Sequence, residues 1–575
     1  MPRRQAANWV INTFYNMARI DLAQNRKWSG IFEGEFFGNL FLTKNIDLEK
    51  SKGKVVLGEA YSAVFDSADD ADLVTPVAFI RTAADTTDRY WVNAGKLFKT
   101  TNTNPEVGWT QDAIASSPTA PLYDLLDFAG ALLCPIDTNI SRLLAGTWTG
   151  NWWSSLSGAS ALQTGKPHRL AIFSGAVLIT DGRFINTYDG TLAIDPAITL
   201  PLQFDAYWIR TTADFAYIGT KNLGGSEAEI FFWDRTSAVF NSRYGIGDSE
   251  ALCGFTVAGI PHIITKKGEI KRFTGQGFRT VQQFPTVELG KTINNIDPNG
   301  VVVDEDIVKI NVDFGVLTDM RLLSGIWTFD TATNNLYHSG SIRNDSGLDY
   351  SQQEVAAAGA MLATLPTQGR YLVGGKAYTA YSGSTKFGIF TSDESSTTGQ
   401  RGYIITPKIS ANNVQRFWRE FILKFKKFLN STDRIRVLYR TQESTTLLPL
   451  YETVTWVTTT TFKSATVPVA VAGNFVEILG GDNAGALAKI TAVSTISGGF
   501  YTYTIDLALN LSASTSRVRF LNFTDLGTVS SQAIQNEVFR VARRDSWIQY
   551  MIELRGKTNS PELEDIMQDY DELRR

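Results

Sequence analysis

The chain has 575 residues, of which 43% are hydrophobic and 19% are charged, a balance typical of folded globular proteins rather than of disordered ones. A formal net charge of −4 provides no basic field for a phosphate backbone, which argues against sequence-specific nucleic-acid binding. Two cysteines, Cys134 and Cys253, are too few for a disulfide framework or a cysteine-rich zinc site. No run of about 18 apolar residues occurs, so we expect no membrane span.

The first 28 residues have a pattern of their own. Trp9, Phe14, Tyr15 and other apolar residues between positions 8 and 23 recur at the spacing of one helical face. The segment lacks both a continuous apolar stretch and an A-x-A cleavage site, so we expect no signal peptide. We predict a short N-terminal amphipathic helical arm over residues 1–28, which either packs on the protein itself or docks on another subunit through Trp9, Phe14 and Tyr15.

Hairpin patterns recur through residues 29–399. Gly95, Gly182, Gly268 and Gly375 each lie between two short runs of alternating apolar residues. The first three glycines are separated by 87 and 86 residues, which is twice the ~43 residues of a four-stranded propeller blade. Further hairpins in the gaps lie around residues 137, 224–225 and 334–335. These seven units predict a seven-bladed β-propeller over residues 29–399.

The early strands 54–57 and 61–64 are expected to complete the last blade, because closing the ring removes exposed strand edges. The alternative is a series of unrelated hairpins in a large sandwich. Regular spacing favours the propeller, since blades of this kind become stable only when they stack on one another.

A different β pattern follows the polar linker at 391–399. Residues 418–428, 434–440 and 547–554 read as strands, the first two with apolar and charged residues alternating, as in strands with one face in water. They predict a β-sandwich formed by residues 400–445 and 523–575. The Thr-, Val- and Gly-rich stretch 446–522 predicts a small β-barrel inserted into a sandwich loop, and we expect it to be peripheral and replaceable. The predicted fold class is therefore all-β.

The sequence offers few residues in arrangements that could support catalysis. The three histidines, His168, His262 and His338, lie on different units and lack the paired spacing of a zinc site or a catalytic triad. We predict a protein that is not an enzyme, with no catalytic residues, no metal site and no cofactor.

Two segments early in the chain, 34–40 and 45–48, and two late ones, 547–554 and 559–566, resemble β-propeller structural proteins of tailed-bacteriophage virions, such as tail nozzle and tail-tip components. The resemblance implies a homo-oligomer that assembles with other virion tail proteins, is made in the host cytoplasm and resides in the tail. It also implies that the last segment is a sandwich strand. Local rules instead make Ser560 a helix N-cap with Pro561 at the first helical position, so the two interpretations conflict.

The competing function is a carbohydrate-binding or carbohydrate-active propeller that contacts a host surface glycan or receptor. Trp152 and Trp153, in the loop that starts at Gly150, are candidate interaction residues, and Trp148 and Trp208 are also available. The alternative role of such tryptophans is packing between blades.

Overall fold

The protein is built almost entirely from strands, which confirms the all-β prediction; the described residues add only two 3-10 turns, η1 (Trp153–Ser155) and η2 (Pro298–Gly300). No helix in this part of the chain is long and apolar enough to cross a membrane. The computed structural model describes residues 17–20, 42–44, 46–47, 54–58, 60–66, 77–82, 89–93, 96–100, 110–112, 124–284, 286, 292–314, 325–340, 356–357, 367–373, 376–382, 387–393, 400–406, 409–410, 416–428, 433–441, 450–464, 471–478, 487–494, 498–509, 515–521, 523–556 and 560–572.

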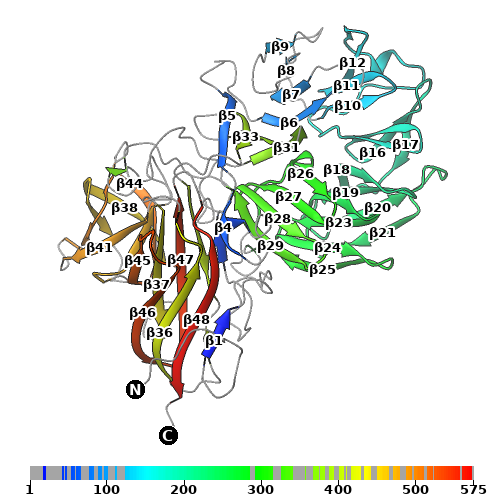
Figure 1. Ribbon diagram of the computed structural model, residues 1–575. Coiled ribbons are helices and arrows are strands. Elements are labelled where there is room, and N and C mark those ends of the chain that lie inside the picture. The colour runs from blue at the N-terminus through cyan, green and yellow to red at the C-terminus, as the bar shows by residue number, and fades with distance from the viewer. Residues whose placement is uncertain are drawn as a thin grey trace.

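Seven four-stranded antiparallel sheets follow one another as propeller blades in the described chain (Figure 1). The first three blades are β6 (Val77–Thr82), β7 (Arg89–Asn93), β8 (Lys96–Thr100) and β9 (Thr110–Asp112); β10 (Leu126–Phe128), β11 (Ala131–Ile136), β12 (Asn139–Leu144) and β13 (Thr147–Thr149); and β14 (Leu170–Phe173), β15 (Ala176–Asp181), β16 (Phe184–Tyr188) and β17 (Ala193–Thr199). The next three are β18 (Phe204–Thr211), β19 (Ala216–Asn222), β20 (Glu229–Trp233) and β21 (Ser242–Gly245); β22 (Ala251–Val257), β23 (Ile260–Thr265), β24 (Glu269–Phe273) and β25 (Phe278–Gln283); and β26 (Val301–Asp304), β27 (Ile307–Val312), β28 (Gly325–Asp330) and β29 (Asn335–Gly340).

The seventh blade closes the ring with a strand from the start of the chain. It consists of β31 (Thr367–Val373), β32 (Lys376–Ser382), β33 (Phe387–Asp393) and the early strand β5 (Ala60–Asp66), which pairs antiparallel with β33. The predicted closure is thus confirmed for the strand at 61–64 and wrong for the strand at 54–57, where Val56 and Leu57 pair with Asp47 and Ile46 instead. Neighbouring blades contact through their first strands, for example β14 with β18 and β31 with β6, so these strands line the propeller axis.

The predicted hairpins do not all occupy the same place in their blades. In the first five blades the hairpin joins the second and third strands, whereas the one at 334–335 joins β28 and β29 and the one at Gly375 joins β31 and β32. A local turn pattern marks a hairpin but not its position within a four-stranded sheet. Because the Gly375 hairpin comes earlier in its blade than the Gly268 hairpin does, the longer separation of 107 residues between these glycines is due to longer connections between strands.

Trp208 shows how adjacent blades interlock. Its side chain is fully buried, and its indole N–H donates to the Ala251 carbonyl at 2.8 Å. A Cβ added at Gly219 would lie 2.0 Å from the Trp208 ring, and one at Gly254 would lie 2.3 Å from it. These two glycines, one in blade four and one in blade five, therefore provide the space that the indole fills.

The C-terminal module is a two-sheet sandwich, as predicted. One sheet has the order β1-β48-β36-β46, and the other has the order β2-β34-β47-β37-β45 with β35 beside β47. The strands are β1 (Met17–Ile20), β2 (Leu42–Lys44), β34 (Gln400–Ile405), β35 (Ile409–Ser410), β36 (Arg416–Phe425), β37 (Arg434–Thr441), β45 (Thr524–Val529), β46 (Asn536–Asp545), β47 (Trp547–Gly556) and β48 (Leu563–Glu572). Trp418, Phe421 and Ile552 pack between the sheets.

Both ends of the chain contribute strands to this sandwich. The predicted N-terminal helix is wrong at Met17–Ile20, which forms β1 and pairs with β48; the rest of the arm at 1–28 lies outside the described residues. A short amphipathic segment gains little helicity alone, whereas the edge of β48 offers it backbone hydrogen bonds. The helix suggested by Ser560 and Pro561 is also absent, because β48 begins at Leu563 and the Ser560 hydroxyl accepts a hydrogen bond from the Leu57 N–H at 2.6 Å. The terminal-strand alternative is correct.

The inserted segment is a closed six-stranded barrel, as predicted. Its strands are β38 (Leu450–Thr458), β39 (Thr461–Ser464), β40 (Phe475–Ile478), β41 (Leu487–Val493), β42 (Tyr501–Ile505) and β44 (Thr515–Leu521). Val454, Phe462 and Ile490 belong to a core of its own. Short pairs complete the strand inventory: β3 (Ile46–Asp47) with β4 (Val56–Leu57), and β30 (Ala356–Ala357) with β43 (Ala508–Leu509).

The barrel is not peripheral, contrary to our expectation. One hydrophobic core contains Trp327 of blade six, Met551 of the sandwich and Phe475 of the barrel. Strand β47 is buried on both faces, since Tyr550 and Ile552 face the other sheet while Met551 faces the propeller and the barrel. The face of β37 that alternation predicted to be in water is half-buried at Arg434 and Arg436 and buried at Leu438 and Arg440. A periodic pattern of charged residues shows which face of a strand is polar, but it does not show whether water or a neighbouring domain covers that face.

Replacing residues 446–522 with a short Gly/Ser loop should therefore destabilise the sandwich. The change removes Phe475, Leu487 and Leu521 from the core that they share with sandwich residues such as Met551, and each large apolar side chain lost from a core costs roughly 1.5–3 kcal/mol. Thermal melting of the remaining chain should shift to lower temperature. Val454→Ala, which alters only the barrel's own core, is the control and should leave the sandwich transition nearly unchanged. A loop variant that melts like the full chain would contradict the shared core.

Candidate functional site

The candidate interaction residues Trp152 and Trp153 lie inside the propeller. They are 4% and 0% exposed; Trp152 packs edge-on against Tyr188 with ring centroids 4.9 Å apart, and the Trp153 indole N–H donates to the Ser160 carbonyl at 2.8 Å. Both rings therefore pack between blades two and three, as the alternative interpretation expected. Trp9, Phe14 and Tyr15 lie outside the described residues.

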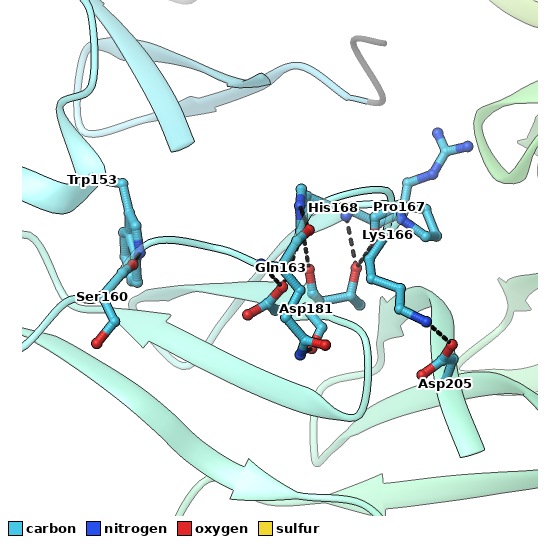
Figure 2. A network of polar contacts seen from close by, with 10 residues as sticks. Trp153, Ser160, Gln163, Lys166, Pro167, His168, Asp181 and Asp205 are labelled. Atoms are coloured by element: carbon cyan, nitrogen blue, oxygen red, sulfur yellow. Dashed lines mark hydrogen bonds and ion pairs between the residues drawn. The ribbon is translucent and has the colours of Figure 1, made fainter. Parts of the chain in front are cut away.

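His168 fastens the loop before blade three to the end of strand β15 in the same blade, as Figure 2 shows. Its two ring nitrogens lie 3.0 Å from the Thr180 carbonyl and 3.1 Å from the Gln163 carbonyl, and Nδ1 lies 3.6 Å from a carboxylate oxygen of Asp181. Asp181 in turn accepts a hydrogen bond from the Gln163 N–H at 2.7 Å. Burial raises the pKa of the Asp181 carboxyl. The fully buried His168 therefore has a structural role.

The other two histidines also pack within blades. The His262 ring stacks on Phe255 with centroids 5.1 Å apart, and burial lowers the pKa of His262 to about 4. His338 packs edge-on against Trp327 at 5.5 Å. Among the residues that the structure describes, no group of three or more His, Cys, Asp or Glu side chains is arranged to hold a metal ion.

The main polar feature of the propeller is a charged network on its axis, centred on η2. Asp297 caps this turn by accepting the Asn299 N–H at 2.8 Å, and Pro298 occupies the first position. η2 contacts the first strands of blades one, five and seven, namely β6, β22 and β31, which places it at the centre of the ring. The Arg169 guanidinium binds the Asp297 carboxylate with both terminal nitrogens, at 3.1 and 3.4 Å.

Two further residues extend the axial network to other blades. Arg210 of blade four donates to the Pro298 carbonyl. Asp124, just before blade two, accepts the Asn299 side-chain amide at 3.0 Å and the Leu170 N–H of blade three at 2.8 Å. The network thus joins blades two, three and four to the segment that begins blade six.

The electrostatics of the axial network follow from its burial. Burial raises the pKa of the Asp297 carboxyl, and the Arg169 guanidinium opposes that rise. For Arg169, burial lowers the pKa, but Asp297 and Asp124 outweigh it, so the pKa of this guanidinium lies above its ordinary value. Each charge therefore depends on its partner, and the arrangement acts as a crosslink between blades.

Sequence reasoning missed the axial network because its members are far apart. Asn299 and Asp124 are separated by 175 positions, and Arg169 and Asp297 by 128. The one local signal is the Asp-Pro pair at 297–298, which is typical of a turn start.

Apolar loop residues mark one end of blade four. Leu202 and Leu223 are 76% and 57% exposed, and the Leu223 N–H donates to the carbonyl of Gln203 at 2.9 Å, so the two loops are side by side. Both loops flank the start of β18 and the end of β19. Val239, 62% exposed, lies in the loop between β20 and β21, at the opposite end of the same blade.

Comparison with known proteins gives no family. No family model matches the chain, and no curated protein matches it. Similar solved structures include the extracellular domain of the hybrid two-component system BT4673 from B. thetaiotaomicron (11% identity, TM-score 0.41, 77% of this chain and 47% of that chain). The WD40 domain of Neurospora crassa Pan2 is 7% identical with a TM-score of 0.38, over 59% of this chain and 96% of that one. The β-propeller domain of Myceliophteria thermophila Cps50 is 9% identical with a TM-score of 0.36, over 56% of this chain and 97% of that one. The propeller assignment rests on the seven sheets of this chain.

Arg169→Met should lower the stability of the propeller by about 3–5 kcal/mol, because it leaves the buried Asp297 carboxylate without its partner. Adding Asp297→Asn should restore part of the loss. Urea unfolding followed by tryptophan fluorescence measures both variants. The control is Lys166→Met, which breaks a more exposed pair with Asp205 and should cost at most ~1 kcal/mol. Equal losses in Arg169→Met and Lys166→Met would contradict the role of the axial network.

Proposed function

We propose that this protein is a structural component of a bacteriophage tail, which assembles as a homo-oligomer and presents rigid β surfaces to neighbouring tail proteins or to the host surface. The observation that carries the proposal is the core shared by propeller, sandwich and barrel. The resemblance of the early and late segments to phage tail proteins indicates which kind of structural protein this is.

The shared core suits a rigid structural component. Domains in one chain ordinarily meet through small, polar interfaces that permit relative motion. Here β29, the outermost strand of blade six, is buried along its whole length and contacts β2 and β3. Strand β2 belongs to the sandwich sheet, so the propeller edge continues into the second module and rigid-body motion between them is restricted.

The buried charged groups support a structural role rather than a catalytic one. Arg169 pairs with Asp297, and Arg519 of the barrel pairs with the fully buried Glu477 and also donates to the Tyr403 hydroxyl of the sandwich at 2.9 Å. These groups fasten blades and modules to one another. Of the four tryptophans named for the glycan-binding alternative, Trp152, Trp153 and Trp208 have buried rings, and Trp148 is partly buried.

Purified virions and recombinant protein test the proposal together. We expect the protein in the tail of the purified particle by immunogold labelling, and a ring-shaped oligomer by electron microscopy of the recombinant chain. A strictly monomeric protein that is absent from virions would refute it.

The double substitution Leu202→Asp and Leu223→Asp should weaken assembly without unfolding the chain, because it places charges in an apolar loop pair that suits a protein contact. Sedimentation velocity should show a shift toward smaller species at equal concentration, while the melting temperature stays within a few degrees of the unsubstituted chain. Val239→Asp, at the opposite end of the same blade, is the matched control. The same shift in both variants, or in neither, would exclude this loop pair as the contact.

A further inference from the structure

The interior of the barrel has a polar side built from three strands. Along β38, Val454 and Trp456 are buried while Thr455 and Val457 are exposed, so Glu452 shares the inward face with the buried pair. Ser464 of β39 is buried and its hydroxyl donates to the Glu452 carboxylate. Tyr503 of β42 is fully buried in the same core.

Three polar groups in this interior are buried without a hydrogen-bond partner among the described residues: two that can accept, Oε1 of Glu452 and the hydroxyl oxygen of Tyr503, and one donor, the Trp456 indole N–H. An unpaired polar atom in an apolar interior costs about 1–3 kcal/mol. An apolar pair of similar volume would give the barrel a more stable core. The cost indicates that these atoms serve a group from outside the chain.

Among the described side chains, no cation pairs with the Glu452 carboxyl group. Burial raises the pKa of the Glu452 carboxyl to about 7. The titratable groups on the strand next to Ser464 are the phenols of Tyr501 and Tyr503; burial, with Glu452 and Tyr501 adding to it, raises the pKa of Tyr503 to about 12. Of the cations on the adjoining strands whose side chains the structure describes, Arg519 of β44 pairs with Glu477 and Lys463 of β39 is exposed.

Aromatic rings complete the surroundings. Tyr503 stacks on Phe462 with centroids 5.2 Å apart and packs on Phe520 at 5.1 Å. Ring faces carry negative potential and attract ammonium groups. A single carboxylate is a poor site for Ca²⁺, which takes 6–8 oxygen ligands, whereas an ammonium group needs only a few acceptors and gains from the rings.

We propose that the Glu452 side of the barrel binds a primary ammonium group, with Oε1 of Glu452 and the Tyr503 hydroxyl oxygen as acceptors. The ammonium group is carried either by a free amine or by a lysine side chain of another protein. The site is separate from the axial network and from the Leu202 and Leu223 loops, so its existence does not depend on the tail assignment.

Calorimetric titration of the full chain with methylammonium chloride tests the site, and Nα-acetyl-lysine amide is the second ligand. We expect binding at pH 8 that weakens by about 30-fold at pH 5.5, because a carboxyl with a pKa of about 7 is mostly ionised at the first pH and almost wholly protonated at the second. Glu452→Gln should abolish binding at pH 8, and Tyr503→Phe should weaken it. Glu420→Gln, an exposed carboxylate on the sandwich strand β36, should bind as the unsubstituted chain does.

The two ligands separate the sources. Binding of methylammonium alone indicates a site for free small amines, and binding of the lysine derivative as well indicates a site that admits a protein side chain. Near-ultraviolet circular dichroism at pH 5.5, where Glu452 is neutral like glutamine, confirms that Glu452→Gln leaves the barrel folded. The proposal is overturned if neither amine binds at pH 8, if folded Glu452→Gln binds equally well, or if K⁺ binds with the same pattern while both amines do not.

Discussion

Every strand edge in a β protein must be paired, covered or closed, because its free N–H and C=O groups otherwise recruit other chains. This constraint organises the molecule. The propeller closes through the pairing of β5 with β33, and the edge of β48 is occupied by β1. The barrel closes on itself. Blade six presents its outermost strand to β2 and β3 rather than to water. Apart from the barrel, each solution uses a segment far away in the sequence, so the propeller and the sandwich depend on one another.

Interior charges follow a related rule, since a buried charge is stable only beside its partner. Arg169 and Asp297 meet on the propeller axis, and Arg519 and Glu477 meet where the barrel joins the sandwich. Both pairs lie at boundaries between structural units. Hydrophobic contact alone tolerates sliding, whereas a bidentate ion pair fixes one orientation. Apolar burial holds the units together, while the Arg169–Asp297 pair links blades and Arg519, held by Glu477 within the barrel, donates across to Tyr403 of the sandwich.

The sequence was most informative where the physical signal is local. Gly182 and Gly268 mark hairpins because a tight turn needs their backbone freedom, and the spacing of such turns predicts blades. The signal weakens where long-range partners decide the outcome. Met17 to Ile20 and the stretch after Ser560 have helical patterns, yet both form strands because a sheet edge is available to them. Trp152 and Trp153 lie in a Gly-containing loop typical of an exposed site, but the adjoining blade covers them. The link between Asp124 and Asn299 leaves no trace in either local sequence.

Ring closure by β5 also determines when this strand finds its partner during synthesis of the chain. During synthesis, Asp66 leaves the ribosome long before Phe387 and the rest of β33 exist, and β2 waits similarly for β34. At about 5–20 residues per second, the roughly 320 intervening residues take about 15–65 seconds to appear. For that interval β5 and β2 lack the strands with which they pair in the folded protein. A cell that makes this protein must therefore shield an unpaired β segment for most of the time the chain is being translated.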